Sequence, residues 1–275
     1  MHIREKMLLM FNNPVNAWHE HVWFQGGAAN PVLNVALLEK HMAAYDAMGF
    51  DKLVMSLPVT NPKRCSVELF KAANTAVYES MKRYPGKIYG MAYVHAGHIK
   101  EALYEIDHCV QDLGMVGLKL YYDYFMDDPV QFALAEKCID LDIPILIHSG
   151  HVTDPETTKM QPRISDGVHM ANIARRYPEA TFIMGHIGGG GDWQWAIKAI
   201  ADCKNVYADI GGSIHDRPLI EESVRYLGAD RLLFATDGAW SSGVSKILGA
   251  DISDDDKKTI LAGCKFSKYL ERAGK

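Results

Sequence analysis

The sequence predicts an α/β protein that folds as a single (β/α)₈ barrel, also called a TIM barrel, over residues 1–275. Three observations support this prediction: eight short apolar runs, helix-spaced apolar residues between them, and a recurrence of about 25 to 35 residues, the size of a βαβ unit. The length lies within the range of one such barrel. A doubly wound open sheet is the alternative, because the same alternation of elements also builds that fold.

The eight predicted strands are apolar runs, several of them almost unbroken, such as IPILIH and TFIMGH. Strands of a parallel sheet are buried on both faces, and their sequences therefore read in this way. In chain order the predicted strands are Val15–Val22, Lys52–Leu57, Ile88–Val94, Val116–Tyr121, Pro144–His148, Thr181–His186, Val206–Ile210 and Leu232–Thr236.

Apolar residues spaced three and four apart predict helices between these strands, each with one face on the sheet. The clearest patterns cover residues 70–81, 103–113 and 170–177. A last helix is predicted over 253–272, because a serine N-cap is followed by three aspartates, which favour a helix N-terminus. The longest connection predicted to be non-helical is 149–164, after the fifth strand, and long connections in compact domains are often functional.

Composition narrows the class of protein. The net charge of −5 provides no basic excess for nucleic-acid binding, and no apolar run approaches the roughly 20 residues of a membrane span. The five cysteines are scattered and form no CxxC pair, which is typical of a reducing compartment. We therefore expect a cytoplasmic protein whose partner is a small-molecule substrate. A homo-oligomer is possible, because barrels of this kind commonly associate.

Ionisable side chains end several of the predicted strands, where barrels carry their catalytic groups. His19 and His21 follow the first strand's period of two and can share one face, while His148, His186 and Asp237 end the fifth, sixth and eighth runs. Each histidine alone could be a capped core residue, and Asp237 could be a helix N-cap, a metal ligand or a general base.

Taken together, these strand ends predict a metal site. His19, His21, His148 and Asp237 would provide three nitrogens and one oxygen for a single divalent ion, with Zn²⁺ favoured and Mn²⁺ or Fe²⁺ possible. One open position would hold a water that the ion activates at neutral pH. His186 would be free to polarise a carbonyl or to move a proton, and Asp237 could accept the proton of the water.

Three further residues are predicted to bind substrate. Lys119 shares a face with Tyr121 in the fourth run, and an unmodified lysine beside a metal would hold a substrate carboxylate. The alternative is a lysine that reaches solvent over the rim. Arg163 lies in the long connection and suits bidentate capture of a carboxylate, although pairing with Asp154 or Asp166 is an equal alternative. The substrate is therefore expected to be a small anion.

The ordered motifs resemble the amidohydrolase superfamily, and within it the amidohydrolase-related branch of small lactonases, other hydrolases and non-oxidative decarboxylases. The motifs are HEH at 19–21, GLKL at 117–120, LIHSGH at 146–151, GHIGG at 185–189 and FATD at 234–237. The resemblance implies a barrel with a divalent metal on His19, His21, His148 and Asp237, assisted by His186. It favours one metal, although a fourth-strand lysine is carbamylated and bridges two metals in some members. Ala17 departs from the family's frequent aspartate two residues before the first histidine.

These observations predict a metal-dependent hydrolase that acts on a small, carboxylated ester, lactone or amide. The alternative is a non-oxidative decarboxylase with the same site, and the short chain favours hydrolysis, because decarboxylases of this branch often carry inserted segments. A third hypothesis is a metal-free barrel that binds phosphate through glycine nests at Gly188–Gly191 and Gly211–Gly212. That hypothesis leaves the histidines without a role.

Overall fold

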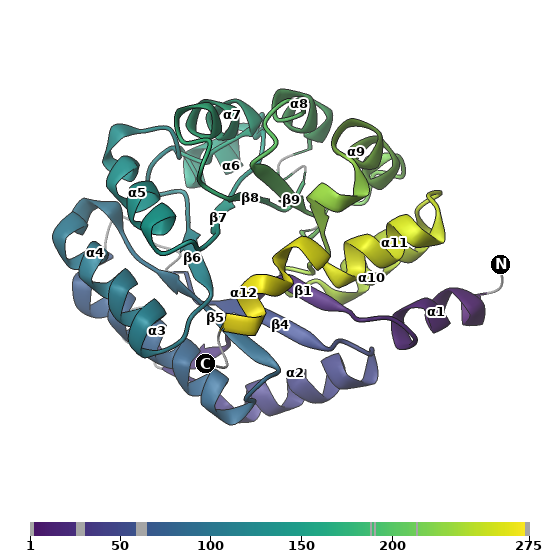
Figure 1. The fold of residues 1–275 in the computed structure, drawn as a ribbon, viewed down its shortest axis with the longest axis horizontal. Coiled ribbons are helices and arrows are strands. Elements are labelled where there is room, and N and C mark those ends of the chain that lie inside the picture. Colours follow the sequence, from purple (N-terminus) through teal and green to yellow (C-terminus); the bar gives the residue numbers. More distant parts are fainter. Residues whose placement is uncertain are drawn as a thin grey trace.

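Eight parallel strands form one sheet whose order follows the chain, β1-β4-β5-β6-β7-β8-β9-β10 (Figure 1). The computed structural model describes residues 3–25, 31–58, 65–187, 189, 191–212 and 214–272. Each predicted run contains one of these strands. Their bounds are β1 (Asn16–His21), β4 (Lys52–Ser56), β5 (Ile88–Tyr93), β6 (Gly117–Leu120), β7 (Ile145–His148), β8 (Phe182–Gly185), β9 (Val206–Asp209) and β10 (Leu232–Leu233).

Backbone hydrogen bonds between the first strand and the segment after the last join the two ends of the sheet. The amide of Trp18 donates to the carbonyl of Phe234 at 2.8 Å, and the amide of Asp237 donates to the carbonyl of His19 at 2.9 Å. The sheet therefore closes into a barrel, as predicted, and the open-sheet alternative is wrong. Closure also places the first and eighth strand ends side by side.

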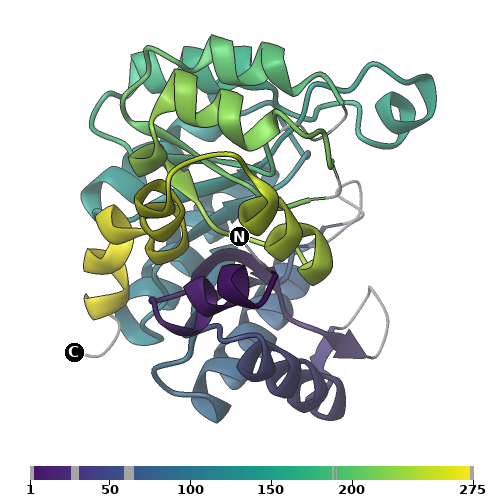
Figure 2. The same ribbon diagram turned by 90° about the vertical axis from the view of Figure 1, so that its right-hand side faces the viewer.

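Helices surround the ring of strands (Figures 1 and 2). Helix α3 illustrates why they form: Ser66 caps its first turn by accepting from the amide of Leu69, and its buried face packs on the sheet. The helices are α1 (Ile3–Phe11), α2 (Val35–Ala47), α3 (Val67–Arg83), α4 (Ile99–Asp107), α5 (Phe132–Asp140), α6 (Pro155–Met160), α7 (Gly167–Arg176), α8 (Trp193–Ala199), α9 (Leu219–Leu227), α10 (Trp240–Gly249), α11 (Asp254–Ala262) and α12 (Ser267–Arg272).

The C-terminal segment closes one end of the barrel. Phe266, Tyr269 and Leu270 join a buried cluster with residues near the starts of the strands, and the rings of Phe266 and Trp18 lie 4.9 Å apart. In Figure 1 the yellow α12 lies across this end of the ring. The opposite end, where the strands finish, is therefore the one that a ligand can enter.

The structure differs from the sequence predictions in three segments. The expected helix over 253–272 ends at Gly263, which has a left-handed φ of 58°, and resumes as α12. The connection 149–164 contains the short helix α6. The antiparallel strands β2 (Phe24–Gln25) and β3 (Val32–Leu33) had no recognised pattern. Among the described residues, no helix is long and apolar enough to span a membrane.

Candidate metal centre

His19, His21 and Asp237 meet at the end of the barrel where the strands finish. Each offers one ligand atom, and these atoms lie within 4.8 Å of one another. The Nε2 atoms of His21 and His19 lie 2.7 and 3.5 Å from Asp237 Oδ1. Three of the four predicted ligands are thus gathered around one point.

Irregular backbone conformations near these residues direct their side chains towards one another. The pairing of β1 with β4 changes register between Ala17 and Glu20, and bulges next to active sites commonly redirect a side chain. His19 is fully buried, whereas the His21 side chain is 30% exposed. Asp237 follows β10 with a left-handed φ of 52°, and helix α10 has Ala239 as its N-cap. Asp237 is therefore not the cap of that helix.

Acceptors behind the two histidines orient their rings. His19 Nδ1 lies 2.9 Å from Asp209 Oδ2, and His21 Nδ1 lies 3.4 Å from the carbonyl oxygen of Ser56. A carboxylate only accepts, so His19 donates from Nδ1 to Asp209 and presents a bare Nε2 towards Asp237. His21 instead donates from Nε2 to Asp237 Oδ1 at 2.7 Å. Metal-binding histidines are usually oriented by such acceptors.

Asp209, at the end of β9, is a residue that the sequence reading missed. It is fully buried, and its Oδ1 also accepts from the amides of His186 and Gly211, each at 2.8 Å. Asp209 therefore provides the carboxylate that orients a metal-binding histidine, in a chain that has Ala17 where the family often has an aspartate. An acid at the end of the seventh apolar run, VYAD, was the available signal.

Glu20 points away from the two histidines, and its hydrogen bonds hold β1 against the segment that follows β10. Its carboxylate accepts from the amide and hydroxyl of Thr236, at 2.8 and 2.7 Å, and from the Tyr45 hydroxyl at 2.7 Å. Burial raises the pKa of Glu20 to about 7, although these hydrogen bonds oppose the rise. This residue, also missed, holds β1 against the segment that carries Asp237.

The charges of the cluster suit a cation. Burial is the main cause that lowers the pKa of His19 to about 4, and the positive charge of the nearby Lys119 acts in the same direction. The imidazole is therefore neutral near pH 7. Burial acts to raise the pKa of Asp237, but His19 and a hydrogen bond from His21 together hold it well below its usual value. Neutral imidazoles and an ionised carboxylate are the forms that bind metal, so the residues present fit a divalent ion.

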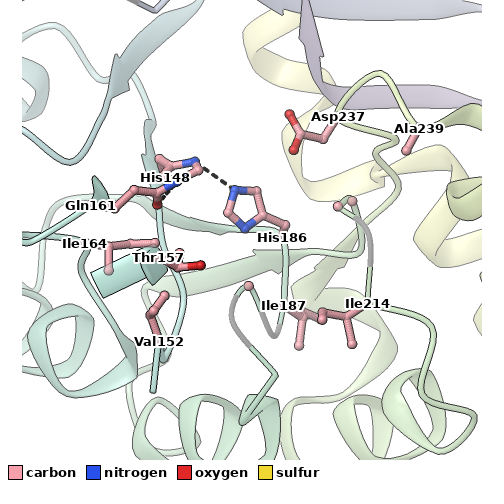
Figure 3. A pocket seen from close by; sticks show the side chains of 13 residues that line it. His148, Val152, Thr157, Gln161, Ile164, His186, Ile187, Ile214, Asp237 and Ala239 are labelled. Atoms are coloured by element: carbon pink, nitrogen blue, oxygen red, sulfur yellow. Dashed lines mark hydrogen bonds between the residues drawn. The ribbon is translucent and has the colours of Figure 1, made fainter. Parts of the chain in front are cut away.

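His148 and His186 form a pair beside the cluster. They line the same pocket of about 240 Å³ as Asp237 (Figure 3). His148 Nε2 lies 3.0 Å from Gln161 Oε1, which only accepts, and His148 Nδ1 therefore accepts from His186 Nε2 at 2.9 Å. His148 thus lies outside the three-residue cluster, and its role as a fourth ligand stays a prediction.

His186 has an unusual backbone conformation, with a φ of 40°, and two glycines leave room for its side chain. A Cβ atom on Gly212 would come within 2.8 Å of His186 Cβ, and one on Gly189 within 2.8 Å of His186 Nδ1. Positive φ at a non-glycine residue costs free energy, and such residues cluster at functional sites. The predicted glycine nest cannot be described, because Gly188 and Gly190 lie outside the described residues.

The residues predicted to bind substrate lie in three different settings. Lys119 is fully buried in β6, and its Nζ lies 2.6 Å from His19 Nε2. It therefore does not reach solvent over the rim. The Tyr121 ring lies 4.3 Å from the ring of His148. The Arg163 guanidinium donates to the carbonyl of Asp123 at 3.0 Å. Its two predicted partners contact other groups, since Asp154 accepts from the amide of Thr157 and Asp166 pairs with His151.

Apolar side chains form much of the remaining pocket wall. Val152, Ile164, Ile187 and Ile214 line it together with the histidine pair (Figure 3). Val152 and Ile164 come from the segment that contains α6, so this predicted long connection does border the site. The pocket is small beside the roughly 300–1,000 Å³ typical of ligand sites and suits a compact, partly apolar molecule.

Comparison with known proteins identifies relatives of this chain. A family described as Amidohydrolase matches residues 40–263. The γ-resorcylate decarboxylase of Polaromonas sp. strain JS666 is 24% identical, over 84% of this chain and 87% of the relative.

Two solved structures share the fold. A 2,6-dihydroxybenzoate decarboxylase from Rhizobium has a TM-score of 0.74 and 17% identity, covering 96% of this chain and 100% of the other. A dihydroxybenzoic acid decarboxylase from the same Polaromonas strain, with bound manganese and the inhibitor 2-nitroresorcinol, has a TM-score of 0.72 and 18% identity, covering 96% and 98%.

Proposed function

Because the chain belongs to the amidohydrolase family, we propose that it is a metal-dependent, non-oxidative decarboxylase of a small aromatic acid. The observation that carries the proposal is the cluster of His19, His21 and Asp237 at the wall of a pocket that also holds the pair His148 and His186. The pocket's aliphatic wall is compatible with a planar ring.

The comparisons favour this activity over the hydrolysis expected from the sequence. Relatives named as decarboxylases extend over most of this chain and most of their own length. These coverages outweigh the argument from chain length, so the decarboxylase alternative is better supported than hydrolysis. The manganese in one of these structures also weakens the expectation of zinc, so we propose a divalent ion and would test manganese first.

The proposed reaction replaces a carboxylate on a ring carbon by a proton and releases CO₂. Bound at the cluster, a divalent ion would draw electron density from an oxygen of the substrate. Protein groups must then deliver the proton to the ring carbon. His186 carries a hydrogen on Nε2, directed at His148 Nδ1, whereas Asp237 is held as a carboxylate. We therefore assign proton delivery to His186, which must be an imidazolium when it acts, so that loss of one proton to the ring carbon returns it to the neutral imidazole. His148 orients it through the hydrogen bond to Nε2.

Burial lowers the pKa of His186, which favours its neutral form. An anionic substrate in the pocket would act in the opposite sense, since nearby negative charge stabilises the imidazolium. Proton delivery would thus be tied to the presence of the acid. His186 would thus be neutral in the absence of the substrate, and it would be cationic when the acid is bound and a proton must be transferred to the ring carbon.

The test is CO₂ release from a panel of hydroxybenzoates, with lactones and esters in parallel, after chelation and reloading with Mn²⁺ or Zn²⁺. We expect metal-dependent CO₂ release that His21→Ala abolishes. His108→Ala is the matched control, since His108 is an exposed histidine paired with Asp112. Turnover of a lactone or ester without CO₂ release from any aromatic acid would instead support the hydrolase.

A further inference from the structure

Lys119 makes a contact that the proposed reaction does not explain. Its Nζ lies 2.6 Å from His19 Nε2, with both side chains fully buried. His19 donates from Nδ1 to Asp209, so its Nε2 carries only a lone pair. The lysine ammonium therefore donates to the atom of His19 that faces Asp237 in the metal cluster.

One lone pair cannot serve two cations. An imidazole nitrogen has a single lone pair in the plane of its ring, and it either accepts a hydrogen bond or binds a metal. The ammonium and a divalent ion would also repel each other strongly in a buried site, where the effective dielectric constant is low. Metal binding at His19 therefore requires Lys119 to leave Nε2.

We propose that Lys119 and the metal ion compete for His19, so that metal binding displaces the lysine and makes its ammonium available to a substrate carboxylate. The inference rests on the metal site of the proposed function. A displaced ammonium remains buried and needs a new acceptor, because an unpaired buried charge is costly. The acid would then bind well only after the metal. The same lysine would lower metal affinity and raise substrate affinity.

Lys246 provides a matched control. It also lies near the cluster, and the carboxylates of Asp209 and Asp237 act on both lysines. Its Nζ donates to the carbonyls of Gly211 and Gly212, each at 2.9 Å, rather than to a histidine. Removing the charge of Lys246 therefore measures how much electrostatic repulsion between a nearby ammonium and the metal ion lowers metal affinity, while the contacts of His19 stay unchanged.

The first experiment measures Mn²⁺ affinity by competition with a chromogenic chelator for the wild type, Lys119→Met and Lys246→Met. We expect Lys119→Met to bind Mn²⁺ at least tenfold more tightly and Lys246→Met to change affinity less than threefold. Unchanged or weaker binding by Lys119→Met would overturn the inference, and weaker binding would indicate a lysine that helps to hold the metal. An equal gain in both variants would also overturn it, because repulsion alone would then explain the result.

The second experiment measures benzoate binding to Mn²⁺-loaded protein. Lys119→Met should bind benzoate at least tenfold more weakly than the wild type. Equal binding would overturn the inference that the displaced ammonium binds the substrate carboxylate. Lys119→Gln repeats both experiments if the methionine variant does not fold. If neither the wild type nor the variants bind Mn²⁺ or Zn²⁺, the proposed function itself fails, and the inference fails with it. Unchanged metal affinity in Lys119→Met defeats the inference alone.

Discussion

Asp209→Asn should weaken metal binding although it changes a residue that is not a proposed ligand. Oδ1 of Asp209 accepts from two backbone amides, and Oδ2 accepts from His19 Nδ1. In the variant the side-chain carbonyl must keep the two amide contacts, since backbone N–H groups only donate. The amide nitrogen then faces His19 and donates to Nδ1. The proton of His19 moves to Nε2, and a protonated Nε2 cannot bind a metal.

The size of the effect follows from the hydrogen bond that is lost. A hydrogen bond to a charged group contributes about 1.5–3 kcal/mol, which corresponds to roughly 10- to 150-fold in affinity. This range overlaps the roughly 10- to 100-fold losses seen when partners of metal-binding histidines are changed. We therefore expect Asp209→Asn to bind Mn²⁺ about 10- to 100-fold more weakly.

The assay is chelator competition, with the folded state checked by circular dichroism. Asp123→Asn is the control, because Asp123 is also buried but accepts from Tyr93 and contacts no proposed ligand. Wild-type affinity in a folded Asp209→Asn protein would show that this carboxylate does not set the tautomer of His19.

Three further predictions concern catalysis and stability. His186→Ala should keep its metal and lose about 100-fold or more in CO₂ release, measured on metal-loaded protein; normal turnover would remove its proposed role. Burial raises the pKa of Asp123 from 3.8 to about 7, so the folded state retains a proton that the unfolded chain loses. Its contribution to stability is full below about pH 4 and falls by up to about 4 kcal/mol as the pH rises through about 7. Asp123→Asn should flatten this dependence in denaturant titrations, and an unchanged slope would contradict it. Arg231→Ala should lower the free energy of unfolding by about 3 kcal/mol or more, because Arg231 donates to four backbone carbonyls. The exposed Arg225→Ala should change it little, and equal effects would refute the argument.

The sequence was enough to predict the barrel and the ends of its strands. Apolar runs such as IPILIH are local signals, because a strand buried on both faces must be apolar along its whole length. Position at a strand end then singled out His19, His21 and Asp237 as candidates. Weak local signals were missed: β2 and β3 have two residues each, and the helix break rests on one glycine, Gly263, in a left-handed conformation.

The order of the elements and the chemical types of side chain at the mouth of the barrel could therefore be predicted from local patterns in the chain. The partners of these side chains came from the folded chain: Asp209 lies behind His19 from 190 residues away, Lys119 contacts the same ring from 100 residues away, and His148 pairs with His186. The physical reason is that hydrophobic periodicity acts between near neighbours in the chain. Hydrogen bonds between strand ends depend instead on how the ring closes and on which rotamers its interior admits.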